Sequence, residues 1–463
     1  FFTMLNYRYL ILYFLLAFLS CSLFANRPNI ILILVDDMAY GDPNCYGGTL
    51  VQTKNIDMLA KNGIRFTQGY SASPVCGPSR VALMTGSYPG RFGIYANVDM
   101  GAVQIPADRA ILPVQLKNAG YSTGLIGKWN LNNPSWNPMP PEKYFDEHFH
   151  TMVWEGDYWP DKNGNYHGVS DGRYGSSKTN NIWGPEIKGQ VYLTDLLTDT
   201  ACDFIESNAQ SCNPFFLYLA YNAPHSPLQG KLVHKEEHLK HINSEALKLY
   251  ASMLLSIDEG IGKLINQLEK NGLIDNTLVC FISDNGPAIT NFKGLPAEWK
   301  KNMLLGSTQG FRGQKAEYFE GGIRIPFILS WPKFVEKGQV IHTPVSTLDL
   351  YPTLSSIAEV ELPEKYSFDG LNLSPLLKDS RYRMKRKPFF WAGGKIGKST
   401  GAVRDGDWKL LIEHEQRDYL FNLKNDPEEN NNLTTKAPLQ YKKLKKYFYT
   451  ILEALPEPVT PRK

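Results

Sequence analysis

An excess of either charge is missing from this sequence of 463 residues. Its 49 lysine and arginine residues nearly balance 46 aspartate and glutamate residues, so the formal net charge is only +3. That balance gives no reason to expect a nucleic-acid partner. Internal repeats are also missing, whereas apolar residues make up 43% of the chain, as in ordinary globular proteins. The length suits one large domain with a smaller one, or two to three ordinary domains.

Long apolar runs are scarce as well. The run Leu10–Leu19 is shorter than the ~20 residues that span a membrane. With Arg8 before it and small residues after it, this run predicts a signal peptide over residues 1–25. Two cleavage sites compete: "FLSC" resembles a bacterial lipobox that would place a lipid on Cys21, whereas cleavage after Ala25 would release a soluble protein. We expect an exported bacterial protein that is periplasmic, anchored at the outer membrane or extracellular, and that contacts a membrane only if Cys21 carries a lipid.

Cysteine is rare, with six residues in the whole chain. The cysteines beyond Cys21 are Cys45, Cys76, Cys202, Cys212 and Cys280. Their number is odd, which predicts one unpaired thiol with a separate role. Cys202 and Cys212 are close enough in the sequence to form a disulfide, but spacing alone does not establish the pairing.

Four apolar segments share one pattern, because each runs without interruption toward polar side chains. They are Asn29–Val35 before Asp36, Tyr121–Ile126 before Lys128, Phe215–Tyr221 before His225, and Leu278–Ser283 before Asp284. Such runs are typical of strands buried on both faces of a mostly parallel sheet. Helical patterns occupy Asn55–Asn62, Thr194–Asn208 and Ala246–Asn271, so we expect an α/β domain. Ligands of such sheets bind beyond the carboxyl ends of the strands.

The pattern changes after about residue 378. Two strand-like segments flank an Asp-Gly turn at residues 405–406, and Leu439–Leu455 is an amphipathic helix. We therefore predict a large α/β domain over residues 26–378 and a small α+β domain, with an antiparallel sheet and a helix, over residues 379–463. Residues 135–185 show weak periodicity, and we expect long loops there.

Acidic and amide side chains follow two of the predicted strands. Asp36 and Asp37 follow the first strand, and Asp284 and Asn285 follow the last. These four side chains form an all-oxygen set, which suits calcium or magnesium rather than zinc. Either pair alone is equally typical of a helix cap or a turn. Their shared place at strand ends favours a metal site.

Four basic side chains accompany these acids: Arg80, Lys128, His225 and Lys315. Fixed cations beside a metal suit a tetrahedral anion such as sulfate or phosphate, because arginine offers a bidentate fork and lysine a compact charge. A single lysine is more often a surface residue. Lys128 follows an apolar strand and Lys315 lies in a glycine-bounded segment, and both features favour a place in the site.

The segment at residues 75–86 reads VCGPSRVALMTG. Pro78 is placed where a helix begins, so Cys76 would lie at a helix N-terminus, where unpaired N–H groups favour an anion. Arg80 follows four residues later, on the same helix face. The arrangement suits a nucleophile beside a cation, such as a thiolate, although a buried structural cysteine is also compatible with it.

This segment resembles the signature of the formylglycine-dependent, type I sulfatases. Other segments resemble the same family in the same order along the chain: PNIILILVDDMAYGD, GLIGKWN, YNAPHSPL, FISDNG, GQKAEYFEGGIRIPFILSWP, DGDWKL and LKNDPEENNNL. The resemblance covers nearly all of the chain beyond the signal peptide. It implies an alkaline-phosphatase-like fold, in which a large mixed and mostly parallel sheet is sandwiched by helices and followed by a small C-terminal α+β domain.

The resemblance also implies a role for each matching residue. Asp36, Asp37, Asp284 and Asn285 would hold calcium, with magnesium less favoured. A separate maturation enzyme would oxidise Cys76 to formylglycine, whose hydrate contacts the metal and attacks sulfur. The remaining roles are transition-state stabilisation by Arg80, Lys128 and Lys315, and protonation of the leaving oxygen or contact with sulfate by His225.

One position departs from the family pattern. The family usually has histidine two residues after the lysine that corresponds to Lys128, and this chain has Asn130. An amide cannot take up a proton near neutral pH. Three alternatives remain: another base (Asp36, His148, His150 or His167) acts in sulfate expulsion, expulsion is slow, or the protein binds sulfate esters with little turnover.

We therefore expect an exported sulfatase that acts on a sulfated carbohydrate or on a small sulfate ester. A phosphonate or phosphodiester hydrolase of the same superfold is the alternative enzyme. A weakly active binder of sulfated glycans is the alternative outside enzymology, motivated by Asn130.

Overall fold

The computed structural model describes residues 27–97, 105, 109–131, 140–151, 157–160, 191–290, 301–394, 400–413 and 417–459. The predicted signal peptide, Cys21 and His167 lie outside these residues, as do the side chain of His150 and most of the region 152–190. Among the helices that are described, none is both long enough and apolar enough to cross a membrane.

An eight-stranded sheet forms the centre of the molecule. Its strand order is β10 (Gln339–Ile341), β2 (Ile64–Phe66), β9 (Phe327–Ser330), β7 (Thr277–Ser283), β1 (Asn29–Val35), β6 (Phe215–Tyr221), β4 (Ser122–Lys128) and β5 (Glu147–Thr151). Among these described strands, only β9 runs antiparallel to its neighbours β7 and β2, and all other pairs are parallel. The predicted mixed, mostly parallel sheet is thus confirmed.

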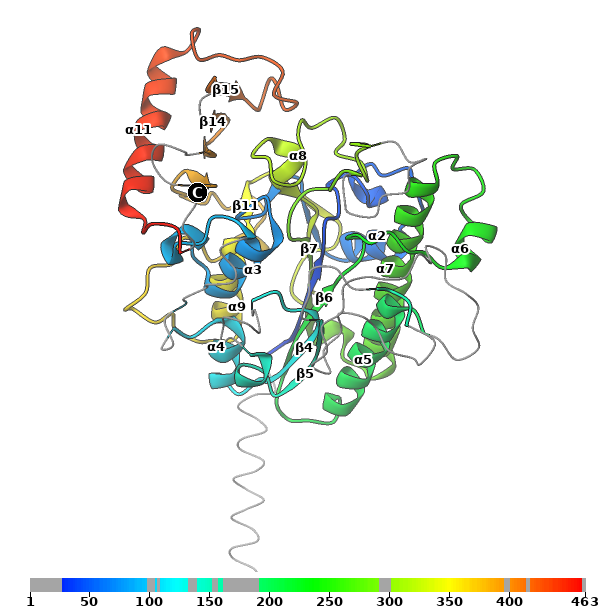
Figure 1. The fold of residues 1–463 in the computed structure, drawn as a ribbon. Coiled ribbons are helices and arrows are strands. Elements are labelled where there is room, and N and C mark those ends of the chain that lie inside the picture. The colour runs from blue at the N-terminus through cyan, green and yellow to red at the C-terminus, as the bar shows by residue number, and fades with distance from the viewer. Residues whose placement is uncertain are drawn as a thin grey trace, which may run out of the picture.

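Helices cover both faces of this sheet (Figure 1). One layer contains α3 (Cys76–Thr85), α4 (Leu112–Asn118), α9 (Leu350–Ile357) and α10 (Ser374–Lys378), and the other contains α2 (Lys54–Lys61), α5 (Leu193–Asn208), α7 (Glu245–Lys270) and the short α6 (Leu232–Glu237). Side chains of β1 alternate between the two resulting cores: Ile30, Leu32 and Leu34 join one, and Ile31, Ile33 and Val35 join the other. Burial on both faces explains why this strand is apolar throughout.

Two smaller sheets complete the fold. The first has the order β11 (Val345–Ser346), β3 (Gly69–Tyr70) and β8 (Arg324–Ile325), and α8 (Glu320–Ile323) precedes β8. The second is antiparallel, with β12 (Phe389–Ala392), β13 (Gly401–Asp405), β14 (Trp408–Ile412) and β15 (Tyr419–Asn422) in sequence order. Helix α11 (Pro438–Ala454) packs against this second sheet through Leu444, Phe448 and Leu452. Short 3-10 turns are η1 (Asn44–Tyr46), η2 (Pro89–Phe92), η4 (Pro141–Lys143), η5 (Ile274–Asn276) and η6 (Thr347–Asp349).

Strand register brings the predicted polar residues to one edge. Val35 of β1 pairs with Tyr221 of β6 and with Ser283 of β7, so Asp36 and Asp284 leave their strands at the same level. Lys128 is the last residue of β4, directly after the pair between Gly127 and Ala220. The carboxyl ends of β1, β4, β6 and β7 therefore converge.

Two local expectations were wrong. Residues 147–151 form the edge strand β5 within the region expected to be loop, because a short exposed edge strand with charged residues carries no long apolar run. The odd cysteine count does not single out one thiol, since Cys45, Cys76, Cys202 and Cys280 are all free. A bridge between Cys202 and Cys212 is accordingly not formed.

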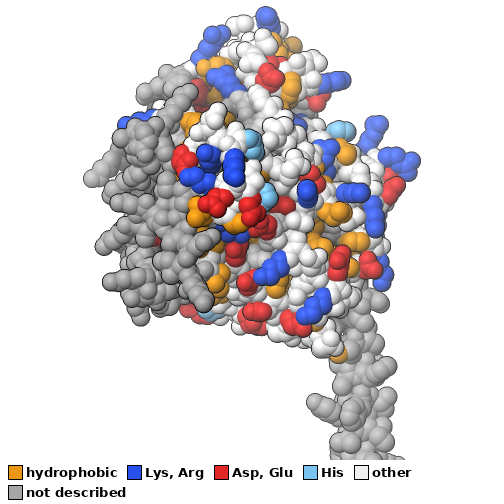
Figure 2. Space-filling view, turned by 90° about the vertical axis from the view of Figure 1, so that its right-hand side faces the viewer, with side chains coloured by type: hydrophobic (Ala, Val, Ile, Leu, Met, Phe, Trp, Pro, Cys, Tyr) orange, Lys and Arg blue, Asp and Glu red, His pale blue; other side chains and the backbone are white. Residues whose placement is uncertain are grey.

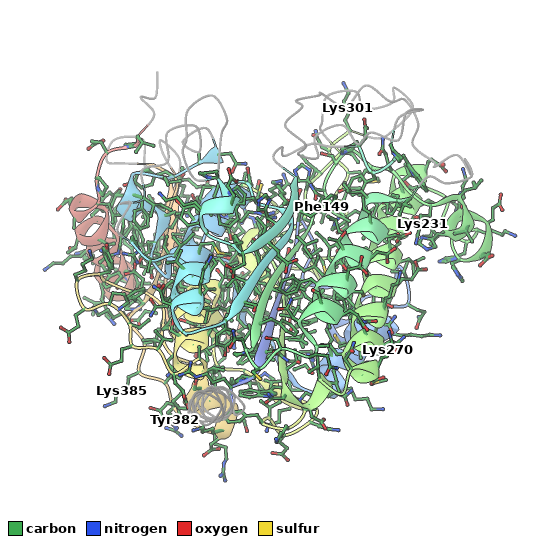
Figure 3. All side chains as sticks on the ribbon, turned by 90° about the horizontal axis from the view of Figure 1, so that it is seen from below. Phe149, Lys231, Lys270, Lys301, Tyr382 and Lys385 are labelled. Atoms are coloured by element: carbon green, nitrogen blue, oxygen red, sulfur yellow. The ribbon has the colours of Figure 1, made fainter. Side chains whose placement is uncertain are left out.

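Charged side chains of both signs are interspersed on the face formed by α5, α6 and α7 (Figure 2). Many form ion pairs, such as Lys231 with Glu259 at 2.7 Å and Lys235 with Glu245 at 2.9 Å. Figure 3 shows Lys231 and Lys270 on this side of the molecule and Tyr382 and Lys385 on the other side. This face is therefore a mixed polar surface without a dominant charge.

Candidate active site

The acidic residues are held by the strand ends that carry them. The Asp284 backbone N–H donates to the carbonyl of Val35 at 3.1 Å, and the Asp37 N–H donates to Oδ1 of Asp284 at 3.2 Å. The Asn285 amide donates to Oδ1 of Asp37 at 2.7 Å. Asp37 has a φ of 66°, so the chain turns sharply between Asp36 and the next residues. The predicted quartet is therefore one buried cluster.

Each carboxylate of the cluster is paired with a predicted cation. Arg80 donates from Nε and Nη2 to Oδ2 of Asp284, at 3.1 and 2.8 Å. Lys128 is ion-paired with Asp36, and Lys315 Nζ lies 2.8 Å from the oxygens of Asp37. Arg80 and Lys128 are both fully buried. Buried charges of this kind must be paired, because an isolated one is far too costly to desolvate.

The pKa values of Asp36 and Asp284 are shifted in opposite directions. Burial alone would raise the pKa of Asp36, but the nearby charges of Lys128, His225 and Arg80 outweigh it and hold that pKa far below its usual range. Burial, together with the negative charge of Asp36, raises the pKa of Asp284 to about 7 despite Arg80. A further cation in the cluster would favour ionisation of both carboxyl groups.

The residues fit a hard divalent cation. Oδ1 of Asp36 and Oδ1 of Asn285 are buried without a hydrogen-bond partner among the described residues. Ligand atoms of Asp36, Asp284 and Cys76 lie within 4.8 Å of one another, as do those of Asp36, Asp37 and His225. Unsatisfied buried oxygens are costly, and an oxygen-liganded ion such as calcium would satisfy them.

Cys76 is the first residue of α3 and is only 1% exposed. Cys76 therefore lies at the helix N-terminus, as predicted. Arg80 follows four residues later in the same helix. Asn97, which sequence reasoning missed, directs its side-chain amide at Cys76, with Nδ2 3.7 Å from Sγ. No pattern around Asn97 marks it out, because it lies in an irregular segment far from the motifs.

His225 faces the acids through one ring nitrogen. Its Nδ1 lies 2.7 Å from the carbonyl of Ser226, so Nδ1 carries a proton, and Nε2 lies 3.7 Å from Oδ2 of Asp37. Burial, with help from the charge of Lys315, lowers the pKa of His225 to about 4. Nε2 is thus the ring nitrogen that faces the acidic cluster.

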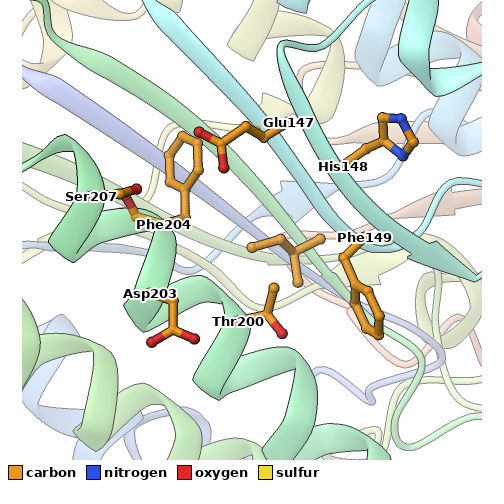
Figure 4. Close-up of a pocket in the computed structure, with 9 residues that line it drawn as sticks. Glu147, His148, Phe149, Thr200, Asp203, Phe204 and Ser207 are labelled. Atoms are coloured by element: carbon orange, nitrogen blue, oxygen red, sulfur yellow. The ribbon is translucent and has the colours of Figure 1, made fainter.

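Two further predicted residues lie differently. Asn130 is buried with a φ of 52°, and its Nδ2 has no hydrogen-bond partner among the described residues. His148 is exposed on β5, opposite Leu125 rather than Lys128. It lines a separate cavity of about 510 Å³ between β5 and α5, together with Phe149, Thr200, Asp203 and Phe204 (Figure 4). His148 is therefore not brought into the acidic cluster.

An oxygen-rich cation site, three fixed cations and a helix N-terminus meet at the carboxyl ends of a mostly parallel sheet. These features define an enzyme of the class that hydrolyses esters of tetrahedral anions.

The comparisons with known proteins are consistent with that class. Residues 28–360 match the Sulfatase family, and residues 311–457 match the family described as N-sulphoglucosamine sulphohydrolase, C-terminal. N-acetylgalactosamine-6-sulfatase of Homo sapiens is 34% identical over 388 residues, which cover 81% of this chain and 70% of that protein. Uncharacterized sulfatase YdeN of Escherichia coli (strain K12) is 32% identical over 399 residues, covering 79% of this chain and 68% of YdeN.

Solved structures show the same relationship. The crystal structure of Ps i-CgsB in complex with k-i-k-neocarrahexaose superposes with a TM-score of 0.79 at 32% identity, covering 93% of this chain and 94% of that one. The chain therefore belongs to the type I sulfatase family, whose members are sulfuric ester hydrolases. The predicted alkaline-phosphatase-like fold is confirmed.

Proposed function

We propose that this protein is an exported sulfatase that removes sulfate from a sulfated carbohydrate, using formylglycine made from Cys76 by a separate maturation enzyme. The observation that carries the proposal is the position of Cys76, at the first turn of α3 and beside an acidic cluster with unsatisfied buried oxygens. The carbohydrate part is supported by the relatives, one named for an N-acetylgalactosamine sulfate and one crystallised with neocarrahexaose.

Calcium would be held by Asp36, Asp37, Asp284, Asn285 and the side chain of residue 76, with magnesium less favoured because the site offers so many protein oxygens. When present, the metal would neutralise sulfate oxygens, and the hydrated aldehyde would supply a hydroxyl nucleophile. Cys76 Sγ in the structure stands in for an oxygen of that hydrate.

The cations of the chain then have a second task. Arg80, Lys128 and Lys315 are paired with the acids in the structure. Acids that bind a divalent metal no longer need three monovalent partners, so these side chains become available to sulfate oxygens. Arg80 and Lys128 are fully buried and Lys315 is mostly so, and charge that develops during sulfuryl transfer is stabilised by such cations in a site with little water.

His225 is the proton donor for the leaving oxygen. Its Nδ1 is committed to the Ser226 carbonyl, so Nε2 must carry the proton that is transferred. Burial disfavours the charged ring, whereas an anionic sulfate beside it favours that form. For the later expulsion of sulfate, Asn130 cannot act as a base, and Asp36 is a weak one because the nearby cations hold its pKa far below the usual range.

Release of sulfate tests this proposal. The calcium-loaded, aldehyde-bearing protein is incubated with defined sulfated oligosaccharides, and free sulfate is measured by ion chromatography. We expect more than one equivalent per protein from at least one oligosaccharide, and none from a Cys76→Ala variant. Stoichiometric binding without turnover would instead favour the glycan binder, and faster cleavage of a matched phosphodiester would favour the alternative hydrolase.

Three simpler measurements test the remaining parts. Peptide mass across residue 76 must show the loss of sulfur that accompanies aldehyde formation, and an intact thiol after co-expression with a maturation enzyme would refute the mechanism. The mass of the mature N-terminus distinguishes a lipid on Cys21 from cleavage after Ala25. Cell fractionation tests export, and a cytoplasmic, uncleaved protein would contradict it.

A further inference from the structure

Asn97 contacts both the side chain of Cys76 and the backbone of the first turn of α3, the helix that begins at Cys76. Its Oδ1 accepts a hydrogen bond from the backbone N–H of Gly77 at 3.1 Å, and its Nδ2 lies 3.7 Å from Cys76 Sγ. The segment that contains Asn97 follows η2, so it reaches α3 from 21 residues further along the chain.

The backbone decides which way this amide points. The first N–H groups of a helix have no partner within the helix, and the N-cap residue of α3 is Val75, whose side chain cannot supply one. An N–H can be satisfied only by an acceptor, so Oδ1 of Asn97 must face Gly77. Nδ2, which can only donate, is thereby directed at the side chain of Cys76.

We infer that Asn97 is a further catalytic residue, whose amide N–H donates a hydrogen bond to an oxygen on residue 76 of the active enzyme. This inference rests on the proposed conversion of Cys76. An attacking oxygen carries partial negative charge, and a fixed donor beside it stabilises that charge. Arg80 lies on the same helix four residues further on, and Asn97 adds a directional contact to residue 76 itself.

Three variants separate the donor from the helix cap. Asn97→Asp keeps an acceptor for the Gly77 N–H and replaces the donor with a second acceptor. Asn97→Ala removes both contacts. Asn372→Asp is the matched control, because Asn372 is exposed and its Oδ1 accepts the Ser374 N–H at the start of α10, at 2.8 Å.

We expect Asn97→Asp to convert residue 76 normally and to keep the Tm of the wild type. Its kcat for a small sulfate ester should fall about 10- to 100-fold, with little change in KM, because a donor to a charged oxygen is lost. Asn97→Ala should show the same loss of kcat, with a Tm lower by about 1–2 °C because the cap is lost as well. Asn372→Asp should keep the wild-type kcat.

A kcat of Asn97→Asp within about threefold of the wild type would overturn the donor role, since an unstabilised charge costs more than that. If kcat falls only in the variant whose Tm also falls, Asn97 acts as a helix cap and not as a donor. That result would overturn the donor role as well.

A second readout does not depend on turnover. A crystal structure of the aldehyde-bearing enzyme should place Asn97 Nδ2 within about 3.2 Å of an oxygen on residue 76. An amide turned away from residue 76 would overturn the inference. If mass spectrometry finds an intact thiol at residue 76, or the wild type releases no sulfate from any ester, the proposed function fails by itself. The same structure then decides separately whether Asn97 contacts the Cys76 side chain.

Discussion

Asp284 accepts hydrogen bonds from both a guanidinium group and a backbone N–H. Nε and Nη2 of Arg80 donate to its Oδ2, and the backbone N–H of Asp37 donates to its Oδ1. The carboxylate thus links α3 to the ends of β1 and β7. Its charge is the partner of a guanidinium group that is fully buried.

Asp284→Asn should lower the free energy of unfolding by about 3–5 kcal/mol, because Arg80 stays buried without its counter-charge. Calcium should no longer raise the Tm of this variant, since one proposed metal ligand has lost its charge. Denaturant and thermal unfolding, each with calcium and with chelator, measure both effects.

The control is Asp199→Asn, because Asp199 forms an exposed ion pair with Lys263. Exposed pairs contribute at most about 1 kcal/mol, so this variant should unfold like the wild type and respond fully to calcium. A normal calcium response in Asp284→Asn would remove Asp284 from the metal site.

Asn130→His tests the departure from the family pattern. Within the part of the chain that the structure describes, the buried amide has no partner for Nδ2, and it cannot take up a proton. If sulfate expulsion limits turnover, histidine should raise kcat by about tenfold or more, the range of a positioned general base. Calcium affinity, measured by titration, should not change. An unchanged kcat would show that Asn130 does not limit the rate.

At the scale of elements, the site depends on how closely β4 approaches β6. Gly127 precedes Lys128 with a φ of +100°, and a Cβ there would overlap the carbonyl oxygen of Ala220. No other residue type fits, so glycine fixes the strand end from which Lys128 reaches Asp36.

Gly127→Ala should lower the free energy of unfolding by about 2–4 kcal/mol, because the strand must shift and a strained φ remains. Its kcat should fall further than the loss of folded protein explains, since Lys128 moves with the strand. Gly272→Ala is the control: its φ is +66° and its Cβ would meet no described atom within 4 Å. That variant should lose only about 1–2 kcal/mol and keep kcat. Equal losses in both variants would contradict a role for the close approach.

At the scale of the whole molecule, the C-terminal sheet is joined to the large domain by buried charges. Lys409 of β14 lies 2.9 Å from Glu320 at the start of α8 and 2.9 Å from Glu429 after β15. The Glu320 N–H also donates to Oε2 of Glu429 at 2.6 Å. Because α8 follows Lys315 by five residues, this cluster supports the segment that carries a site lysine.

Glu429 should make stability depend on pH. Burial, opposed by Lys409 but assisted by Glu320, raises the pKa of Glu429 to about 7 from an ordinary value of 4.5. Between these values the folded state holds a proton that the unfolded state has lost, so this group lowers the free energy of unfolding as pH rises from about 4.5 to 7. Glu429→Gln cannot titrate and should lack this part of the pH dependence.

Thermal unfolding at pH 5, 6, 7 and 8 checks this sign. The Tm of Glu429→Gln minus that of the wild type should increase toward pH 8. In the wild type, Glu429 must either ionise while buried or keep a proton that the unfolded chain would release, and both lower its stability. The glutamine of the variant does neither. Glu428→Gln, at an exposed neighbouring position, is the control and should show a constant difference. A constant difference for Glu429→Gln would refute the raised pKa.

Much of the site was predictable from local patterns. β1 and β6 were predicted with their observed bounds, because burial on both faces requires an uninterrupted apolar run. Polar residues that end such runs must lie at the same edge of a parallel sheet, so Asp36, Lys128 and Asp284 could be grouped from the sequence alone. The motif around Cys76 added the family and the roles that it implies.

The prediction failed where no local pattern marks the outcome. β5 is an edge strand that needs no apolar run. The cysteine count was misleading, since a free thiol can also be a small apolar core residue, as the buried Cys280 is.

The sequence by itself determined four central strands of the sheet, the position of the acids and cations at their ends, and the family, because periodicity and motif spacing are properties of short segments. Only the tertiary structure decided which cation pairs with which acid, and that Asn97 meets Cys76. Those contacts join residues far apart in the chain, and their geometry follows from strand register and from how the segments pack, which no local pattern encodes.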